Sequence, residues 1–314
     1  MKYDIYFHND FDGRASAAVM LAFLRSRGDD IAHYTALTYG HEAPWLASDL
    51  TKKKNPAIVV DFLYHPGTAF WFDHHPTTFR KPEWKAKFKP DRQHRYDPSY
   101  KSACSFTYAC LKKDFKWKPP AHFKTLAKWL DVMDSAGYRS ARETIAMKHP
   151  AYQVDAFIDV VRQTAKDNAR LIGLLAEYSL AQVVKVPRIA AGIRTIQKKA
   201  ARSMRFYETH VRVFKRTTLI DTTGDPLNGL LRYAPFSLYP LAVYNIRLKK
   251  KEGGIWYLGV GENPWRRSEN KLHLGNYMRA HYAGGGHKGI GATEFHTKEE
   301  ALAATEKINA MLNR

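Results

Sequence analysis

The chain has 314 residues, of which 45% are hydrophobic and 13% aromatic, and its formal net charge is +20. This composition excludes a disordered chain, and the presence of only two cysteines, Cys104 and Cys110, excludes a disulfide-rich scaffold. The length accommodates two domains, and the positive charge favours polyanionic partners.

A run prone to β structure opens the chain at residues 3–7. A turn rich in Asp, Asn and Gly follows, and then a helical pattern at residues 15–27. His8, Asp10 and Asp12 alternate through the turn. An extended backbone would therefore direct all three side chains to one side.

A second strand is predicted at residues 57–60, where a continuous apolar segment ends at Asp61. Strands of this buried type occur in parallel α/β sheets, whose carboxyl ends build ligand sites at one edge. We therefore expect Asp61 to lie near the residues that follow the first strand. The alternative is that these aspartates only form turns or cap helices.

A third apolar strand, residues 69–72, is followed by Asp73, His74 and His75. Carboxylate and imidazole groups at the end of such a strand are potential metal ligands at the same sheet edge. Adjacent residues of a strand point to opposite faces, so only one of the two histidines is expected to face the cavity.

A helix is predicted at residues 126–136, where apolar side chains recur on one face. Asp131 and Asp134 are three positions apart and are neighbours on the surface of this helix. Either carboxylate can project into the cavity, and a solvated acidic face is the alternative interpretation.

Converging carboxylates without cations would repel one another and raise their pKa values. Two divalent ions neutralise four such groups, and a mixed carboxylate and imidazole set suits Mn²⁺, Fe²⁺, Co²⁺ or Mg²⁺ better than a structural zinc. Two such ions can clamp a phosphoryl group for in-line attack by a bridging hydroxide. The expected reaction is therefore metal-assisted phosphoester hydrolysis. The four carboxylates in question are Asp10, Asp12, Asp61 and Asp131.

The segment 151–207 has helical periodicity that Pro187 interrupts. Beyond residue 208 strands return, and the predicted elements are strands at 211–214, 218–221, 242–249 and 255–260 and helices at 276–282 and 298–312. We therefore predict an α/β protein in three parts. These are a parallel-sheet domain at residues 1–150, a helical connector at 151–207, and a smaller mixed α/β domain at 208–314.

The last domain contains five glycines within residues 284–291. Glycines let the backbone approach an anion closely and direct several N–H groups at it. The stretch matches neither the P-loop spacing nor the dinucleotide-binding context. A plain surface loop is the alternative. The residues expected to contact phosphate are Gly284, Gly285, Gly286, His287 and Lys288.

Taken together, these motifs resemble those of the DHH phosphoesterase superfamily. Residues 73–75 match the motif that names the family, and residues 8–13 resemble its first motif. Asp61 resembles the second motif, and the helix at 126–136 the fourth, with Asp131 or alternatively Asp134 as its aspartate. Residues 284–292 resemble the signature of the associated C-terminal domain, so the resemblance spans nearly the whole chain.

The resemblance implies a catalytic site with two Mn²⁺ ions, for which Mg²⁺ or Co²⁺ can substitute. Asp61 would bridge the ions and take part in catalysis together with Asp73 and His75, the latter facing the substrate. His287 and its glycine neighbours would bind phosphate. The implied metal ligands are His8, Asp10, Asp12, Asp61, His74 and Asp131.

Members of this family include RecJ-type exonucleases, hydrolases of short oligonucleotides and of nucleotide phosphates, cyclic-dinucleotide phosphodiesterases, and pyro- and polyphosphatases. In this chain, basic clusters interleaved with aromatic residues favour a nucleotide or a short single-stranded nucleic acid as substrate. The alternatives are a pyro- or polyphosphatase, and a nucleic-acid-binding protein with an inert metal site. Cleavage in the 3′–5′ or the 5′–3′ direction stays open.

No run of 18 apolar residues occurs, and a strand opens the sequence. We therefore expect neither a membrane span nor a signal peptide, and we expect a cytoplasmic protein with reduced, buried thiols at Cys104 and Cys110. A homodimer is compatible with the sequence, which does not determine the oligomeric state.

Overall fold

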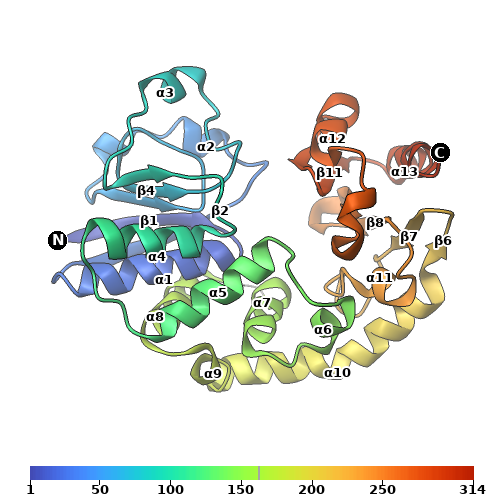
Figure 1. The fold of residues 1–314 in the computed structure, drawn as a ribbon, viewed down its shortest axis with the longest axis horizontal. Helices are drawn as coiled ribbons and strands as arrows, with labels where there is room; N and C mark the ends of the chain where they lie inside the picture. Colours follow the sequence, from blue (N-terminus) through green and yellow to red (C-terminus); the bar gives the residue numbers. More distant parts are fainter. Residues whose placement is uncertain (162) are drawn as a thin grey trace. The chain divides into compact units, whose positions relative to one another are not determined.

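The structure is a computed structural model that describes residues 1–161 and 163–314. The described chain divides into two compact units. The first consists of Met1–Gly137 and His149–Ile193, and the second of Tyr138–Lys148 and Arg194–Arg314. Figure 1 shows the elements of both.

The first unit is built on a five-stranded sheet in the order β2-β1-β3-β4-β5, and every neighbouring pair is parallel. Its strands are β1 (Lys2–His8), β2 (Asp30–Leu37), β3 (Ala57–Val60), β4 (Thr68–Asp73) and β5 (His94–Tyr96). The three strands predicted near residues 3–7, 57–60 and 69–72 are confirmed as β1, β3 and β4. They lie side by side in the sheet.

Both faces of this sheet are buried, which explains why β3 and β4 are continuously apolar. Val60 and Phe72 pack into a core with the larger helices, while Val59 and Trp71 pack into a second core on the other face. The larger helices of this unit are α1 (Phe11–Arg25), α4 (Ala103–Asp114), α5 (His122–Asp134), α7 (Pro150–Val160) and α8 (Ala165–Glu177), followed by the short α9 (Leu180–Val183). The remaining short helices are α2 (Ala43–Leu46), η1 (Leu50–Lys52) and α3 (Pro82–Lys87).

The predicted connector, residues 151–207, is distributed over both units. Leu171 and Leu175 of α8 are buried in the same core as Phe7 of β1, so this helix belongs to the first unit. Pro187 is the first residue of α10 (Pro187–His210), which agrees with the interruption predicted at this residue.

A buried arginine ties α8 to the start of α1. Arg14 is 1% exposed, and its Nε donates to Asn168 Oδ1 at 2.9 Å. One terminal nitrogen of the same guanidinium donates to the Asp10 carbonyl at 2.7 Å, and the other to Asn9 Oδ1 at 2.7 Å. The loop that follows β1 is thereby fixed to a helix more than 150 residues further along the chain.

The second unit contains a six-stranded mixed sheet in the order β10-β11-β9-β8-β7-β6. Only the β7–β8 pair is parallel. The strands are β6 (Arg212–Val213), β7 (Thr217–Asp221), β8 (Tyr244–Lys250), β9 (Trp256–Glu262), β10 (Gly285–His287) and β11 (Ile290–Phe295). The helices, besides α10, are α6 (Ala141–Ala146), α11 (Ala234–Leu238), η2 (Glu252–Gly254), η3 (Pro264–Glu269), α12 (Leu274–Tyr282) and α13 (Lys298–Leu312).

The predicted α/β class, with a parallel sheet followed by a separate mixed domain, is therefore confirmed. Of the predicted strands, the one at 211–214 is shortened to two residues in β6. Cys104 and Cys110 are buried and free, as expected. Within the described residues, no helix combines the length and the apolar character that a membrane crossing requires.

Candidate metal centre

Polar residues gather where three neighbouring strands of the first sheet end. β1 ends at His8, Asp61 follows β3, and His74 follows β4. Because these strands are adjacent and parallel, the side chains meet at one edge. His8 Nδ1 lies 3.7 Å from Asp61 Oδ2, and His74 Nε2 lies 3.7 Å from Asp61 Oδ1.

Asp10 and Asp12 reach this cluster from the first turn of α1. Asp10 caps the helix by accepting the Gly13 N–H at 2.9 Å, and its other oxygen is 2.7 Å from His8 Nδ1. Asp12 already lies within the helix, so the predicted alternation along an extended backbone is wrong. The close approach of the first turn of α1 to the end of β1 requires Gly13, because a Cβ there would lie 2.1 Å from the His8 carbonyl oxygen.

Asp61 combines a strained backbone with almost complete burial. It has a φ of 59°, in the left-handed region that non-glycine residues rarely adopt, and it is 1% exposed. Neither of its oxygens accepts a hydrogen bond from any described residue. Burial, together with the carboxylates of Asp12 and Asp10, raises the pKa of Asp61 well above its ordinary value. A buried carboxylate without donors is stabilised only by a proton or by cations.

Asp12 is held by the backbone at the start of α4. Its two oxygens accept the N–H groups of Ala103 at 2.6 Å and Cys104 at 3.0 Å. Burial and the carboxylates of Asp134 and Asp10 nevertheless raise the pKa of Asp12 well above its ordinary value, against the effect of the two N–H donors. The site thus concentrates negative charge that its own hydrogen bonds do not balance.

The two histidines after β4 both turn toward the cluster, so the prediction that only one faces the cavity is wrong. β4 ends at Asp73, and the alternation of a strand no longer applies beyond that residue. The ring centroids of His74 and His75 are 4.5 Å apart. His74 Nδ1 lies 3.0 Å from the Tyr100 carbonyl, which accepts its proton and leaves Nε2 toward the carboxylates.

His75 is paired with Asp73, which is fully buried. Their side chains approach to 2.8 Å, and His75 Nδ1 is 3.5 Å from Asp61 Oδ1. Burial alone would lower the pKa of His75, but the carboxylates of Asp73 and Asp61 outweigh it and raise the pKa to about 10. Burial alone would raise the pKa of Asp73, but the interaction with His75 outweighs burial and lowers this pKa.

On α5, the structure brings Asp134 rather than Asp131 into the cluster. Asp134 Oδ2 lies 3.5 Å from His74 Nε2. Asp131 accepts a hydrogen bond from the Ser102 hydroxyl at 2.7 Å instead. The spacing of the two aspartates places both on one side of the helix. Their surroundings differ because Asp131 contacts Ser102 at the start of α4, whereas Asp134 contacts His74 after β4.

The donor atoms fit two neighbouring divalent ions. Two sets have ligand atoms that all lie within 4.8 Å of one another, namely His8 with Asp10 and Asp61, and Asp12 with His74 and Asp134. Asp61 also forms such a set with His74 and His75. Carboxylate oxygens and imidazole nitrogens are the donors that Mn²⁺, Fe²⁺ and Mg²⁺ sites use. The oxygens of Asp61 have no hydrogen-bond donor among the described residues, and they lie 3.7 Å from His8 of one set and 3.7 Å from His74 of the other.

No protein-family model and no curated protein matches the sequence. Solved structures match over nearly the whole chain. The pGpG-specific phosphodiesterase PggH from Vibrio cholerae gives a TM-score of 0.70 at 17% identity, over 99% of both chains. RecJ from Thermus thermophilus, in complex with Mn²⁺, gives 0.58 at 13% identity, over 99% of this chain and 52% of RecJ. An exopolyphosphatase-related protein from Bacteroides fragilis gives 0.51 at 15% identity, over 100% of this chain and 94% of the other.

The chain has the fold of the DHH phosphoesterases. The match to PggH over 99% of both chains includes the C-terminal unit, so the resemblance inferred from the motifs at both ends holds at the level of the fold.

In the second unit, the glycine stretch forms a β-hairpin rather than a plain loop. β10 and β11 pair antiparallel, with Lys288 and Gly289 at the turn. A Cβ on Gly286 would lie 2.2 Å from the Ile290 carbonyl oxygen, and this residue has a φ of 134°. By contrast, no atom lies within 4 Å of the position that a Cβ on Gly285 would take. Gly286 is therefore needed for the hairpin itself, whereas Gly285 opens onto unfilled space.

Tyr39 borders the cluster and was not singled out from the sequence. It follows β2, and its ring centroid lies 4.9 Å from that of His8 and 5.6 Å from that of His75. Its hydroxyl is buried and hydrogen-bonds to none of the described residues. Burial and the carboxylates of Asp73 and Asp61 raise the pKa of this phenol well above its ordinary value. β2 is only partly buried and lacks the continuous apolar pattern of β3, so its sequence did not predict a site residue after it.

We expect Tyr39→Phe to raise the free energy of unfolding of the metal-free protein by about 1 kcal/mol, because it removes an unpaired buried hydroxyl and keeps the ring. Urea denaturation in EDTA measures this change. Tyr207→Phe is the matched control, since it removes another buried hydroxyl without a described partner, in the second unit. A loss of stability in Tyr39→Phe alone would show that its hydroxyl is bonded after all.

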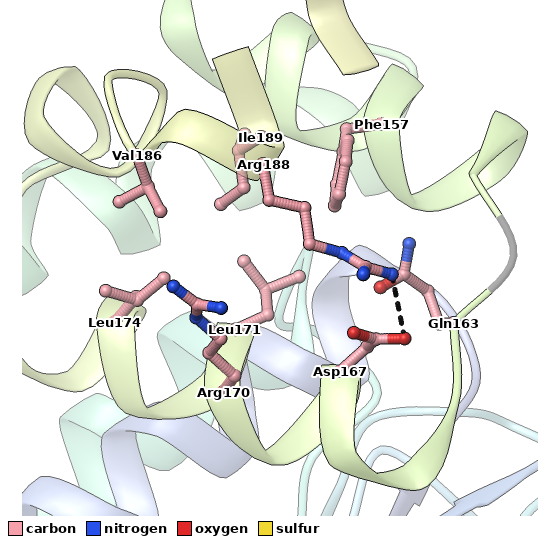
Figure 2. A pocket seen from close by; sticks show the side chains of 9 residues that line it. All are labelled: Phe157, Gln163, Asp167, Arg170, Leu171, Leu174, Val186, Arg188 and Ile189. Carbon is pink, nitrogen blue, oxygen red and sulfur yellow. Dashed lines mark ion pairs between the residues drawn. The ribbon is translucent and has the colours of Figure 1, made fainter. Parts of the chain in front are cut away.

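A separate hollow in the first unit is not the candidate site. It lies between α7, α8 and the first turn of α10, with apolar walls such as Leu171 and Ile189 (Figure 2). Arg188 and Asp167 form an ion pair of 3.0 Å beside it. Its free volume of about 20 Å³ is room for roughly one water molecule. A nucleotide does not fit, and its described lining includes none of the cluster residues.

Proposed function

We propose that the protein is a metal-dependent phosphoester hydrolase acting on short oligonucleotides or nucleotide phosphates. The observation that carries this proposal is the presence of two neighbouring donor sets, His8 with Asp10 and Asp61, and Asp12 with His74 and Asp134. Asp61 also groups with His74 and His75, and its buried oxygens have no hydrogen-bond donor among the described residues. Such a site is suited to two divalent ions, which supply Lewis acidity and an activated water for attack on phosphorus.

The residues proposed to hold the ions are His8, Asp10, Asp12, Asp61, His74 and Asp134. Asp134 takes the place first given to Asp131, because its side chain and not that of Asp131 approaches His74. His75, oriented by Asp73, would donate a hydrogen bond to the phosphate of the substrate. Mn²⁺ is the preferred ion, with Mg²⁺ as the second choice, and RecJ structures are known with each.

Charge supports a polyanionic substrate, and two of the similar structures support a nucleotide rather than an inorganic one. The formal net charge is +20, and α10 carries a row of exposed cations at successive turns. These are Arg194, Lys198, Arg202 and Arg205, which form no ion pair with a described residue. Of the similar structures, one is named for cleaving pGpG and another is the exonuclease RecJ. We therefore place dinucleotides and short single strands ahead of polyphosphate. Polyphosphate is the second candidate, because one of the similar structures is an exopolyphosphatase-related protein.

An activity screen tests the proposal. The purified protein is stripped with EDTA, reloaded with Mn²⁺ or Mg²⁺, and assayed with dinucleotides such as pGpG, single strands of increasing length, cyclic dinucleotides and polyphosphate. We expect turnover to be fastest on the shortest nucleotides and to disappear in EDTA. Hydrolysis of polyphosphate alone would replace the proposed substrate class, and a protein that binds nucleic acid but cleaves none of these substrates would be a binding protein with an inert centre.

The hairpin of the second unit is proposed to contact a phosphate of the substrate through Gly284, Gly285, Gly286, His287 and Lys288. We expect Gly285→Ala to raise KM about tenfold without lowering the melting temperature, because its methyl group meets no protein atom but would occupy the space of the ligand. Gly286→Ala is the contrast, since it should destabilise the unit through the clash with the Ile290 carbonyl. An unchanged KM in Gly285→Ala would assign the hairpin a purely structural role.

A further inference from the structure

Asp131 and Asp134 lie on successive turns of α5, and their surroundings differ. Asp134 faces His74, whereas Asp131 Oδ1 accepts the proton of the Ser102 hydroxyl at 2.7 Å. The Ser135 hydroxyl donates to the Asp131 carbonyl at 2.6 Å, which fixes the turn of backbone between the two aspartates. Asp131 therefore has a specific partner outside the proposed ligand set.

Ser102 is the N-cap of α4 and is fully buried. Its oxygen accepts the Ser105 N–H at 3.2 Å while its proton goes to Asp131. A hydroxyl has one proton, so an acceptor at Asp131 leaves the lone pairs of Ser102 directed at the helix. The next two backbone N–H groups, those of Ala103 and Cys104, are the ones that hold both oxygens of Asp12.

We propose that Asp131 is a positioning residue that acts on the metal centre through Ser102 and the first turn of α4, and that it binds no ion itself. The chain of contacts runs from Asp131 to the Ser102 hydroxyl, from there to the N-terminus of α4, and from the N–H groups of Ala103 and Cys104 to the carboxylate of Asp12. It fixes the carboxylate of Asp12, whose Oδ2 accepts the Ala103 N–H and also lies 3.9 Å from His74 Nε2. This inference rests on the proposed function only in requiring that the cluster binds divalent ions.

The conservative variant separates this role from that of a ligand. Asp131→Asn keeps an oxygen that can accept from Ser102, so Mn²⁺ should bind with two ions per chain and within about threefold of the wild-type affinity. Asp131→Ala removes the acceptor and should weaken one of the two ions by about 10- to 100-fold, the range typical of groups that orient a ligand. The other ion, held by His8, Asp10 and Asp61, should keep its affinity. Asp134→Asn should lose one ion altogether.

Calorimetric titration of the metal-free protein with Mn²⁺ measures these affinities without reference to turnover. Ser102→Ala should match Asp131→Ala, and the double variant should be no weaker than either single one, because both remove the same hydrogen bond. Loss of an ion in Asp131→Asn, equal to that in Asp134→Asn, would make Asp131 a ligand and overturn the inference. Additive losses in the double variant, or equal weakening of both ions in Asp131→Ala, would also overturn it. Two bound ions without turnover on any substrate would overturn the proposed function alone.

Discussion

Replacing Asp61 by asparagine is expected to lower turnover by about 10³-fold or more, while raising the melting temperature of the metal-free protein. Asp61 groups with His8 and Asp10 and also with His74 and His75, so its loss should remove a ligand from each proposed ion. Asparagine has nearly the same shape and tolerates the φ of 59° at this position. A neutral amide is also less costly to bury than a carboxylate whose oxygens have no described donor.

The opposite signs of the two effects separate a lost ligand from a damaged fold. Turnover, Mn²⁺ stoichiometry and thermal unfolding in EDTA are measured on the same preparations. Asp49→Asn is the matched control, since this exposed aspartate accepts the Thr51 N–H and an amide oxygen can do the same. Wild-type turnover with two bound ions in Asp61→Asn would remove Asp61 from the site.

Metal-free protein is expected to lose stability as the pH rises from about 5 to about 9, and to regain it when Mn²⁺ is added. Burial and mutual repulsion raise the folded-state pKa values of Asp12 and Asp61. Above about pH 4 the unfolded chain releases protons that the folded chain retains, so each further rise in pH favours unfolding. The stabilisation is therefore full below about pH 4 and is lost as the pH passes through the raised values.

His75 contributes in the same direction. Burial opposes its charge, but Asp73 and Asp61 raise its pKa to about 10. Its contribution to stability is full below the unfolded value of about 6.5 and disappears as the pH rises through about 10. Burial would raise the pKa of Asp10, but His8 prevails and lowers it, so Asp10 is ionised in both states above about pH 5 and adds no slope there.

Thermal melts at several pH values, in EDTA and with Mn²⁺, measure this dependence. Ions bind the deprotonated carboxylates, so the gain in stability should grow with pH and reach about 4 kcal/mol at 1,000 times the dissociation constant. At each pH, the difference in melting temperature between the wild type and Asp61→Asn is the quantity compared, because the general effect of the +20 charge is nearly the same in both proteins. A difference that does not change between pH 5 and 9 would mean that the cluster ionises as it would in water.

The strands that carry the cluster could be predicted because buried strands of a parallel sheet consist mainly of apolar residues. β1 ends at His8, β4 ends at Asp73, and Asp61 directly follows the apolar β3, and parallel strands bring such ends together. Two details depended on where a regular element stops, and both predictions were wrong. Asp12 lies in a helix rather than in an extended turn, and both His74 and His75 lie beyond the end of β4.

Other parts of the site depend on contacts that no local pattern contains. Asp131 and Asp134 have the same residue type and the same helical face, and only Ser102 and His74 distinguish them. Tyr39 follows β2, a strand whose mixed burial gave no periodic signal. The helical segment after residue 149 resembled a connector, because its packing against β1 and α1 is a long-range property.

The hydrogen bonds of Arg14 have a consequence for the order in which the centre is completed during synthesis. All proposed ligands lie within the first 134 residues, yet the guanidinium that holds the Asp10 backbone is itself held by Asn168. Until α8 has left the ribosome, a buried cation next to the ligand loop lacks one of its acceptors, which is costly in a dry environment. A fragment ending near residue 137 should therefore contain every ligand and still fail to load metal tightly. The proposed centre should therefore form only once residues well past its last ligand have folded back onto the first helix.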